Sequence, residues 1–434
     1  MANITWTVSG RLRVTMAEEK LLSSPFVVTA DLQNAEVEVE GSSLESGGFA
    51  SWGTARTNHR GQFTLTASKP DAQRRIRVRV RFRDDDLKVT APSPASDWTE
   101  VFTSPNKVAP PRVDIGTYTF RKTGEPRADD HYKRAATWYI CKAVIHKLVE
   151  RDPAFAFKDK VTIVYPAKAI NGSYANGLTR SVYINFVSSN DDGPDYGDQW
   201  DVPTVLHEFM HIWNYDHNHG ASNWLGAVTW DADGSTHSFQ EKPAIAFHEG
   251  FAEYAKDELL HHIWGYDKPS LLSRQGLVAR KRVSGDRIRG PVKTPLDTIE
   301  MVERNEDGVI QALHLLTTPD IYTRTFGTES SVPPNEDAGT VSPAPSFCPR
   351  PPEITFWDVL SVFKPNADAG WPTAWEAKQS SGLLRFYDRA ADILQAFDQE
   401  TKALYLELLD RKSTVEPQGR CGVSVSGLSG RPVR

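Results

Sequence analysis

The chain has 434 residues, of which 39% are hydrophobic and 24% are charged. This length accommodates two or three domains, and this composition is typical of a globular protein with a hydrophobic core. The net charge of −6 is small for this length and argues against nucleic acid as the main partner. The cysteines (Cys141, Cys348 and Cys421) are far apart in the sequence and predict neither a disulfide framework nor a CxxC metal motif.

Neither a targeting segment nor a membrane segment is visible in the sequence. The first residues lack the basic start and apolar core of a signal peptide. No apolar run approaches the roughly 18 residues that cross a bilayer. We therefore expect no membrane span, and a protein that is cytoplasmic or exported by a route independent of a signal peptide. The sequence does not indicate an oligomeric state.

The first hundred residues predict β-strands. Residues 75–83 alternate strictly between arginine and an apolar residue, which predicts a strand with one core face and one solvated arginine face. Val37 and Val39 alternate with glutamates in the same way, and Gly61 is expected to form a turn that leads into a further strand. Short strands at this spacing predict an all-β sandwich over residues 1–104.

The segments AEVEVEG (35–41) and WGTARTNHRGQFTL (52–65) resemble transthyretin-like, or carboxypeptidase-regulatory-like, modules. Modules of this family are appended to many extracytoplasmic hydrolases. The resemblance implies an accessory domain that serves in positioning or partner contact. Residues 1–104 contain no constellation of side chains that indicates catalysis.

Four prolines (Pro105, Pro110, Pro111 and Pro126) predict a domain junction over residues 105–127. Helical periodicity follows over 129–150, and buried strands are expected at 161–165 and 180–186. Further helices are predicted at 296–316, 356–363 and 382–409. We expect a second domain over 128–412, with an irregular insertion at 327–353 and a disordered tail at 413–434. A chain that begins near residue 126 should then fold by itself.

Within this second domain, residues 207–211 read His-Glu-Phe-Met-His, an HExxH motif among apolar residues at helical spacing. On a helix, His207 and His211 project from one face and can bind one metal ion, while Glu208 can take a proton from water. A catalytic zinc needs three protein ligands, so one ligand remains to be found. Glu249 is the best candidate. Glu253 lies four residues later on the same helical face, and the two glutamates could exchange roles.

HExxH followed by the segment Glu249-Gly-Phe-Ala-Glu253 resembles the gluzincin metallopeptidases. The resemblance implies an α+β, mostly helical catalytic domain in which His207, His211 and Glu249 hold zinc and Glu208 is the general base. Glu253 would support a zinc-binding histidine by accepting its second ring N–H. His248 is a weaker ligand candidate, because it points about a quarter-turn away from Glu249.

Gluzincins also bind extended substrate along an edge strand, for which Val182, Tyr183, Ile184 and Asn185 are candidates. A Tyr or His beyond the second ligand helix stabilises the oxyanion in that family. Spacing does not choose among the candidates for this role, which are Tyr322, Tyr266 and His314.

The sequence thus predicts a peptidase with one zinc ion per chain and a peptide or protein as substrate. Two alternatives remain at this point. One is a catalytically inactive zincin fold used for binding, and the other is a metal-dependent hydrolase of a non-peptide amide or ester. A third, structural interpretation is a pair of buried helices with a polar seam.

Overall fold

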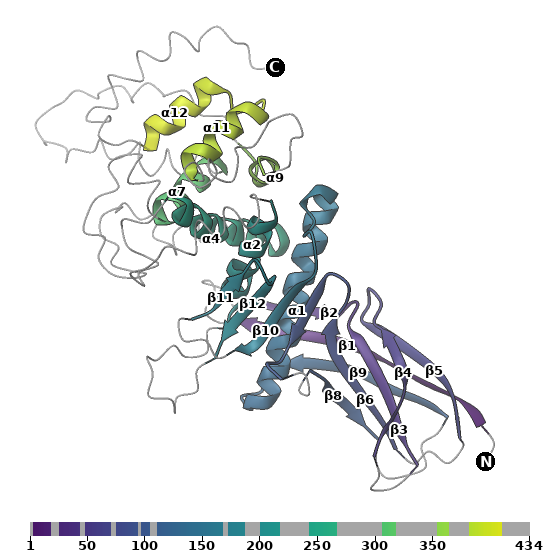
Figure 1. The fold of residues 1–434 in the computed structure, drawn as a ribbon. Coiled ribbons are helices and arrows are strands. Elements are labelled where there is room, and N and C mark those ends of the chain that lie inside the picture. Colours follow the sequence, from purple (N-terminus) through teal and green to yellow (C-terminus); the bar gives the residue numbers. More distant parts are fainter. Residues whose placement is uncertain are drawn as a thin grey trace, which may run out of the picture. The chain divides into compact units, whose positions relative to one another are not determined.

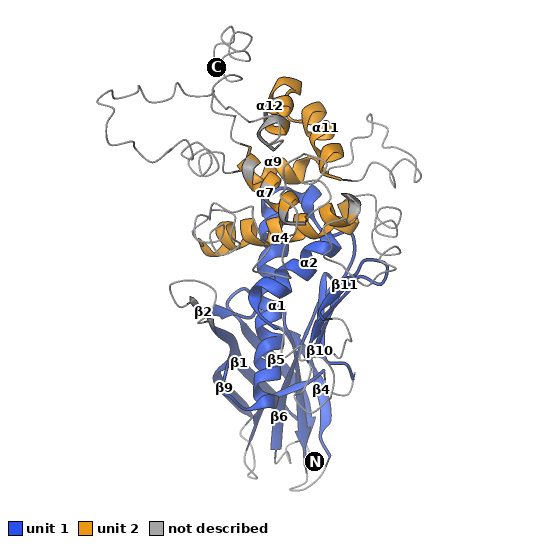
Figure 2. Ribbon diagram, turned by 90° about the vertical axis from the view of Figure 1, so that its left-hand side faces the viewer, with its two compact units in different colours: residues 1–213 blue, residues 214–434 orange. Residues whose placement is uncertain are grey.

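The computed structural model describes residues 3–18, 26–43, 48–70, 75–93, 97–104, 111–167, 172–186, 200–217, 243–266, 306–317, 354–363 and 382–409. These residues form a mixed α/β structure with several helices and two sheets (Figure 1). The chain comprises two compact units, residues 1–213 and 214–434 (Figure 2). The boundary falls inside helix α2 (Val202–His217), so the last turn of this helix belongs to the second unit.

The first unit contains the strands and the long helix α1 (Pro126–Arg151). Its strands in chain order are β1 (Asn3–Glu18), β2 (Phe26–Asp31), β3 (Glu36–Ser42), β4 (Ala50–Arg56), β5 (Gln62–Pro70), β6 (Arg75–Arg83), β7 (Leu87–Thr90), β8 (Thr99–Thr103), β9 (Arg112–Arg121), β10 (Val161–Ala167), β11 (Tyr174–Asn176) and β12 (Ser181–Asn185). A short 3₁₀ turn, Pro153–Phe155, follows α1. The strands expected over the first hundred residues and at 161–165 and 180–186 are confirmed.

The strands are arranged in two sheets. The smaller has the order β2-β1-β5, with β9 parallel to β1, and the larger has the order β11-β12-β10-β7-β6-β3-β4, with β8 paired to β6. Aromatic side chains from both sheets meet in a common core. Trp6 of β1 lies 5.4 Å from Trp52 of β4 between ring centroids, and Phe82 of β6 lies 5.6 Å from Phe120 of β9.

The alternation predicted for β6 is confirmed, but its arginines do not form a solvated ladder. The apolar residues from Ile76 to Phe82 are buried, while the arginines face the glutamates of β3. Arg79 lies 2.7 Å from Glu38, and Arg81 lies 2.6 Å from Glu36, nitrogen to oxygen. The Arg81 guanidinium also covers the Trp98 ring at 4.3 Å from its centroid. The alternating glutamates of residues 36–40 are thus the cross-strand partners of the arginines.

Helix α1 begins with Pro126, a residue favoured at the first helical position, and ends before Pro153. It packs its apolar face on the strands, where the Trp138 indole donates to the carbonyl oxygen of Gln33 at 2.9 Å. Cys141 is fully buried in this face, and burial raises the pKa of its thiol. Cys141 is therefore a small core residue of this helix.

The large sheet crosses the predicted domain junction at residues 105–127. Strand β10 pairs in parallel with β7, Val161 opposite Leu87, and β12 then pairs with β10. Strands from before and after the junction thus form one hydrogen-bonded sheet. The structure divides the chain at a different place, within α2, because this pairing joins β10 and β12 to the N-terminal strands.

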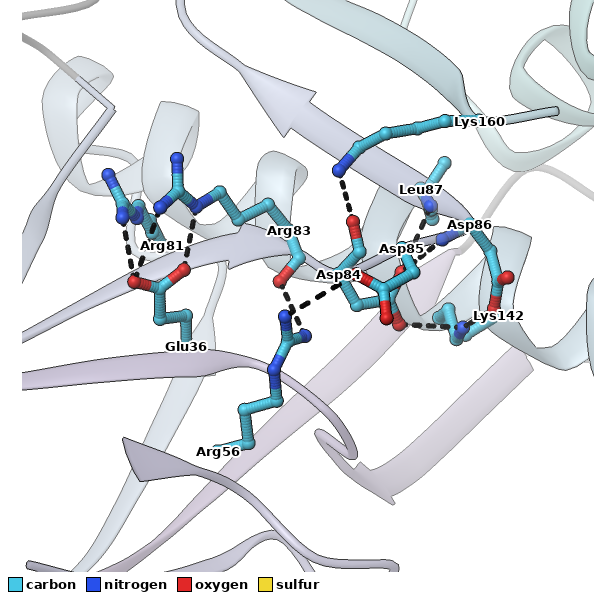
Figure 3. A network of polar contacts seen from close by, with 10 residues as sticks. All are labelled: Glu36, Arg56, Arg81, Arg83, Asp84, Asp85, Asp86, Leu87, Lys142 and Lys160. Carbon is cyan, nitrogen blue, oxygen red and sulfur yellow. Dashed lines mark hydrogen bonds and ion pairs between the residues drawn. The ribbon is translucent and has the colours of Figure 1, made fainter. Parts of the chain in front are cut away.

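A buried ionic network ties α1 to the turn between β6 and β7 (Figure 3). The Lys142 ammonium lies 2.7 Å from the Asp84 carboxylate and 2.8 Å from Asp86, and the side chains of Lys142 and Asp84 are each only 8% exposed. The other carboxylate oxygen of Asp84 accepts the backbone N–H groups of Asp86 and Leu87. Lys160, just before β10, donates to the backbone carbonyl of Asp84. The turn is therefore held by both α1 and the start of β10.

The second unit is helical in its described part. After the end of α2 it contains α4 (Pro243–Trp264), α7 (Glu306–Thr317), α9 (Phe356–Ser361), α11 (Leu383–Ile393) and α12 (Gln399–Leu409). Phe247 of α4 packs against Phe363, just after α9, and against Phe386 of α11. Phe251 of α4 also packs against Phe363. The helix predicted at 356–363 is confirmed over α9, and that at 382–409 is confirmed with a break between α11 and α12.

The helix predicted at 296–316 is confirmed from residue 306 onward, and its first part lies outside the described residues. The same holds for the predicted insertion at 327–353 and the predicted tail at 413–434. Among the helices that the structure describes, none combines the length and hydrophobicity needed to cross a membrane.

Replacing Lys142 with Met should lower the free energy of unfolding by about 3 kcal/mol, because the Asp84 carboxylate then stays buried without its cation. Urea denaturation measures this loss. Lys147→Met on the same helix is the matched control. Its pair with Glu150 is 3.3 Å long and largely exposed, so the expected loss is at most about 0.5 kcal/mol. Equal losses for both variants would contradict a stabilising role of the network.

A chain that begins near residue 126 should not fold, contrary to the expectation from the prolines. Without β7, the backbone groups of β10 that pair with it are exposed at a new sheet edge, and the apolar face of α1 loses its strands. Size-exclusion chromatography of the fragment should show aggregates, and thermal melting should show no cooperative transition. The full chain should elute as a single species and melt cooperatively. A soluble, cooperatively melting fragment would contradict the structural dependence of β10 on β7.

Candidate metal centre

The candidate centre is built on α2, whose sequence specifies a buried helix. The Asp201 side chain accepts the backbone N–H of Thr204 at 2.7 Å and so caps the first turn. The apolar residues around the HExxH motif (Val205, Leu206, Phe209, Met210, Ile212 and Trp213) have no exposed surface. Trp213 also donates its indole N–H to the carbonyl oxygen of Phe155 at 2.8 Å. Packing on this scale fixes the rotation of α2 about its axis, and hence the direction of its polar residues.

The two histidines of α2 converge as the i, i+4 spacing predicts. Their Nε2 atoms lie 2.9 Å apart, and their rings are 4.5 Å apart between centroids with perpendicular planes. Zinc–nitrogen bonds of about 2.0–2.1 Å allow two nitrogens bound to one ion to lie up to about 4 Å apart. The observed Nε2 separation therefore fits a shared metal ion.

Glu249 of α4 supplies a third possible ligand. One ligand atom from each of His207, His211 and Glu249 lies within 4.8 Å of the others, which is the only such group of His, Cys, Asp or Glu among the described residues. Two nitrogens and one carboxylate oxygen make a ligand set used by catalytic zinc. The structure thus brings together the three residues that the sequence predicted as ligands, in a group that could hold a metal ion.

A hydrogen bond outside the ligand set joins the end of α2 to α4. The Asn214 amide nitrogen lies 2.9 Å from Nδ1 of His248. Asn214 is fully buried and follows His211 by three residues, and His248 directly precedes Glu249. This bond therefore couples the two helices next to the residues that would bind metal. The sequence analysis did not identify Asn214, although a buried amide on an otherwise apolar helix indicates a specific partner.

Glu208 lies between the two histidines in sequence and is 7% exposed. Its position about 100° around the helix from His207 places its carboxylate beside the histidine pair rather than in line with it. Glu208 therefore has the placement expected for a general base.

Glu253, the predicted support for a histidine, forms an ion pair with Lys256 of the same helix. The Lys256 ammonium also lies 3.8 Å from the Asp257 carboxylate. Lys256 was not identified from the sequence, but its i+3 spacing from Glu253 could have indicated the pair. The bond from a ring N–H to Glu253 stays a prediction.

Two of the candidate oxyanion donors lie far from Glu249. Helix α4 ends at Trp264, and Tyr266 follows it. At a rise of about 1.5 Å per residue, Trp264 lies about 22 Å along the helix axis from Glu249. His314 of α7 lies 3.4 Å from the Asp257 carboxylate, a position about 12 Å along the axis from Glu249. An oxyanion donor must lie about 3 Å from the reacting oxygen, so neither placement suits that role. Tyr322 lies outside the described residues.

His314 has a different setting, in a buried polar cluster between α4 and α7. Its ring contacts Asp257 and Glu258, and Glu258 in turn accepts the Thr317 hydroxyl at 2.8 Å. The Tyr254 ring stacks edge-on against His314 at 4.9 Å. Burial, and then the charge of Glu258, raises the pKa of the Tyr254 phenol. These residues bind the two helices to each other.

The strand predicted as the substrate edge is an inner strand over most of its length. Val182 of β12 pairs with Ile163 of β10 on one side and with Ala175 of β11 on the other. The Asn185 N–H donates to the Ser173 hydroxyl at 2.9 Å. The prediction of an open edge is wrong at Val182 and Tyr183, because the short β11 pairs with them. For Ile184 and Asn185 it stays a prediction. Figure 1 places β11 and β12 close to α2, and Figure 2 also places β11 there.

Comparison with known proteins adds little. The sequence matches no protein-family model, and no curated relative matches it either. Among solved structures, a 9R-lipoxygenase from Cyanothece PCC8801 shares 15% sequence identity with the aligned part at a TM-score of 0.18. The alignment covers 35% of this chain and 25% of the lipoxygenase chain. A likeness this weak establishes neither a shared fold nor a shared activity.

Alanine substitution of His207, His211 or Glu249 should abolish retention of zinc, because each removes a ligand from a three-ligand set. The measurement is zinc per chain after dialysis, determined by elemental analysis, with an expected value near one for the unaltered protein. His146→Ala, at an exposed position of α1, is the control and should keep the metal. Full zinc occupancy in all the ligand variants would place the metal elsewhere.

Proposed function

We propose that this chain is a zinc-dependent peptidase of the gluzincin type. The observation that supports the proposal best is the convergence of His207, His211 and Glu249 on one point, with the buried Glu208 adjacent. A zinc ion bound there would supply Lewis-acid polarisation of a substrate carbonyl and would lower the pKa of water at the site. A site built only to stabilise the fold would use a fourth protein ligand and would need no base.

In this proposal Glu208 moves the proton. It takes a proton from the attacking water and delivers it to the amine that leaves when the peptide bond breaks, so it acts first as base and then as acid. Its low solvent exposure keeps bulk water from competing for that proton. His207 and His211 would serve as neutral imidazole ligands and take no part in the proton transfer.

Substrate would bind in an extended conformation along the outer edge of β11. Among the described strands, β11 pairs only with β12, so its other side offers backbone groups for a further strand. Tyr174 on β11 stacks on Tyr183 of β12 at 4.7 Å and remains 45% exposed. An exposed aromatic pair at this edge favours substrates with an apolar side chain at the matching position.

We also propose that the N-terminal strands form the transthyretin-like sandwich and that residues 128–412 contain the zincin domain. The pairing of β7 with β10 supports a structural role for the N-terminal part. In this arrangement the accessory strands complete the sheet that runs beside α2, and they do more than recruit a partner.

Two alternative functions would give different results in tests of zinc binding and peptide cleavage. An inactive zincin used for binding would hold zinc and cleave no peptide. A metal-dependent hydrolase of another amide or ester would hold zinc, leave peptides intact and cleave model esters or amides. A mixed peptide library incubated with the protein, with and without a chelator, separates these cases, and readdition of zinc should restore any cleavage that the chelator removes.

Glu208→Gln should keep the fold and the zinc but reduce the rate of peptide cleavage by about 10²–10⁴-fold, since the amide preserves the shape of the side chain and cannot accept the proton. The measurements are single-turnover cleavage, zinc content and circular dichroism. Cleavage at the parental rate would falsify the role of Glu208 as the general base. Loss of zinc from this variant would instead assign Glu208 to the structure of the centre.

A further inference from the structure

The face of α2 that carries the two histidines continues into a buried amide. His207, His211 and Asn214 occupy positions i, i+4 and i+7 of the helix, which fall within about 60° of one another around its axis. Asn214 has no exposed surface. A buried amide needs a hydrogen-bond partner, because an unpaired one destabilises the fold. An element that bonds Asn214 is thereby held next to the histidine pair.

The partner of Asn214 is His248, in the second turn of α4. The amide nitrogen of Asn214 lies 2.9 Å from Nδ1 of the His248 ring. An amide nitrogen only donates, so Nδ1 accepts and the ring carries its proton on Nε2. Glu249, the third residue of the candidate metal group, directly follows His248. The bond thus joins a residue one turn beyond His211 to the residue next to Glu249.

This bond meets a requirement that the covalent chain does not meet. A long stretch of chain separates His211 from Glu249 in the sequence, so bringing the two together costs conformational entropy. A metal ion meets that cost when it binds, unless contacts within the protein have already aligned the two helices. The bond between Asn214 and His248 is a contact of this kind, because it lies beside a predicted ligand on each helix.

We propose that Asn214 and His248 are positioning residues of the metal centre, whose hydrogen bond sets Glu249 against the histidine pair before a metal ion binds. The inference rests on the proposed function, which places zinc at His207, His211 and Glu249. His248 does not belong to the group of converging ligand atoms, so it acts through its neighbour Glu249 and not as a ligand. The bond increases the affinity for zinc by reducing the ordering that binding requires.

Asn214→Leu keeps the approximate size of the side chain but removes the hydrogen bond. We expect zinc affinity about fivefold weaker, the effect of losing one hydrogen bond between neutral groups. Competition with a chromophoric chelator measures this affinity on the full chain. His248→Leu breaks the same bond from a half-buried position and should give the same loss. It also tests the inference if Asn214→Leu does not fold.

A double variant and a rescue variant distinguish positioning from a general effect. Because Asn214→Leu and His248→Leu break one bond, the double variant should bind zinc about as well as either single variant. His248→Asn places an amide oxygen near the former position of Nδ1, where it can accept the Asn214 N–H. This variant should bind zinc within about twofold of the unaltered protein.

Thr317→Val is the matched control, because it also removes a buried hydrogen bond to α4. The Thr317 hydroxyl donates to Glu258 at 2.8 Å, further along the helix that carries Glu249. The control should lower the stability of the metal-free chain in urea about as much as Asn214→Leu does. It should leave zinc affinity unchanged, since its bond does not lie beside a predicted ligand.

The outcomes separate this inference from the proposed function. An unaltered protein that binds no zinc would overturn both, whereas one that binds zinc and cleaves no peptide would overturn the peptidase alone. Parental zinc affinity in His248→Leu would overturn the inference alone. Complete loss of zinc in His248→Leu but not in Asn214→Leu would make His248 a ligand, and this too would overturn it. Additive losses in the double variant, failure of His248→Asn to restore affinity, or an equal loss in Thr317→Val would assign the effect to general stability and overturn it as well.

Discussion

The candidate metal centre depends on the complete burial of the apolar side of α2. A helix that presents two histidines and a glutamate can direct them to one point only if its rotation and position are fixed. In this protein Phe209, Met210 and Trp213 are packed with no exposed surface, and the Asn214 bond to His248 fixes the end of the helix against α4. These contacts hold the Nε2 atoms 2.9 Å apart, close to the separation of about 3.3 Å between two nitrogens bound to one tetrahedral zinc ion.

Features with a local period were predictable from the sequence, and features that join distant segments were not. The alternation of β6, the helix α1 and the HExxH helix follow from the spacing of apolar residues. The pairing of Leu87 with Val161 depends on two strands separated by a whole helix, and a proline-rich stretch between them indicated a domain junction instead. Likewise β11 has only three residues, too few for an alternating pattern, so the sequence left β12 as the apparent edge.

The ligand set was predictable for a similar reason, but the groups that support it were not. His207 and His211 are neighbours on one helix, and Glu249 precedes an acidic residue by one turn, so a known pattern identified all three. The position of an oxyanion donor depends on how later segments return to the centre. The rise of α4 places Tyr266 and the contacts of His314 too far from Glu249, and spacing in the sequence does not contain that information.

The charged residues in the second half of α4 specify how that helix packs against α7. Lys256, Asp257 and Glu258 are all buried, and Glu258 and Asp257 both contact His314. Apolar residues of similar volume at such positions would commonly give an equal or more stable protein, because buried charges lose their hydration. The chain nevertheless carries this cluster on the helix that also carries Glu249. A network of this kind holds α4 and α7 in one packing arrangement, and so fixes the orientation of the helix that carries Glu249.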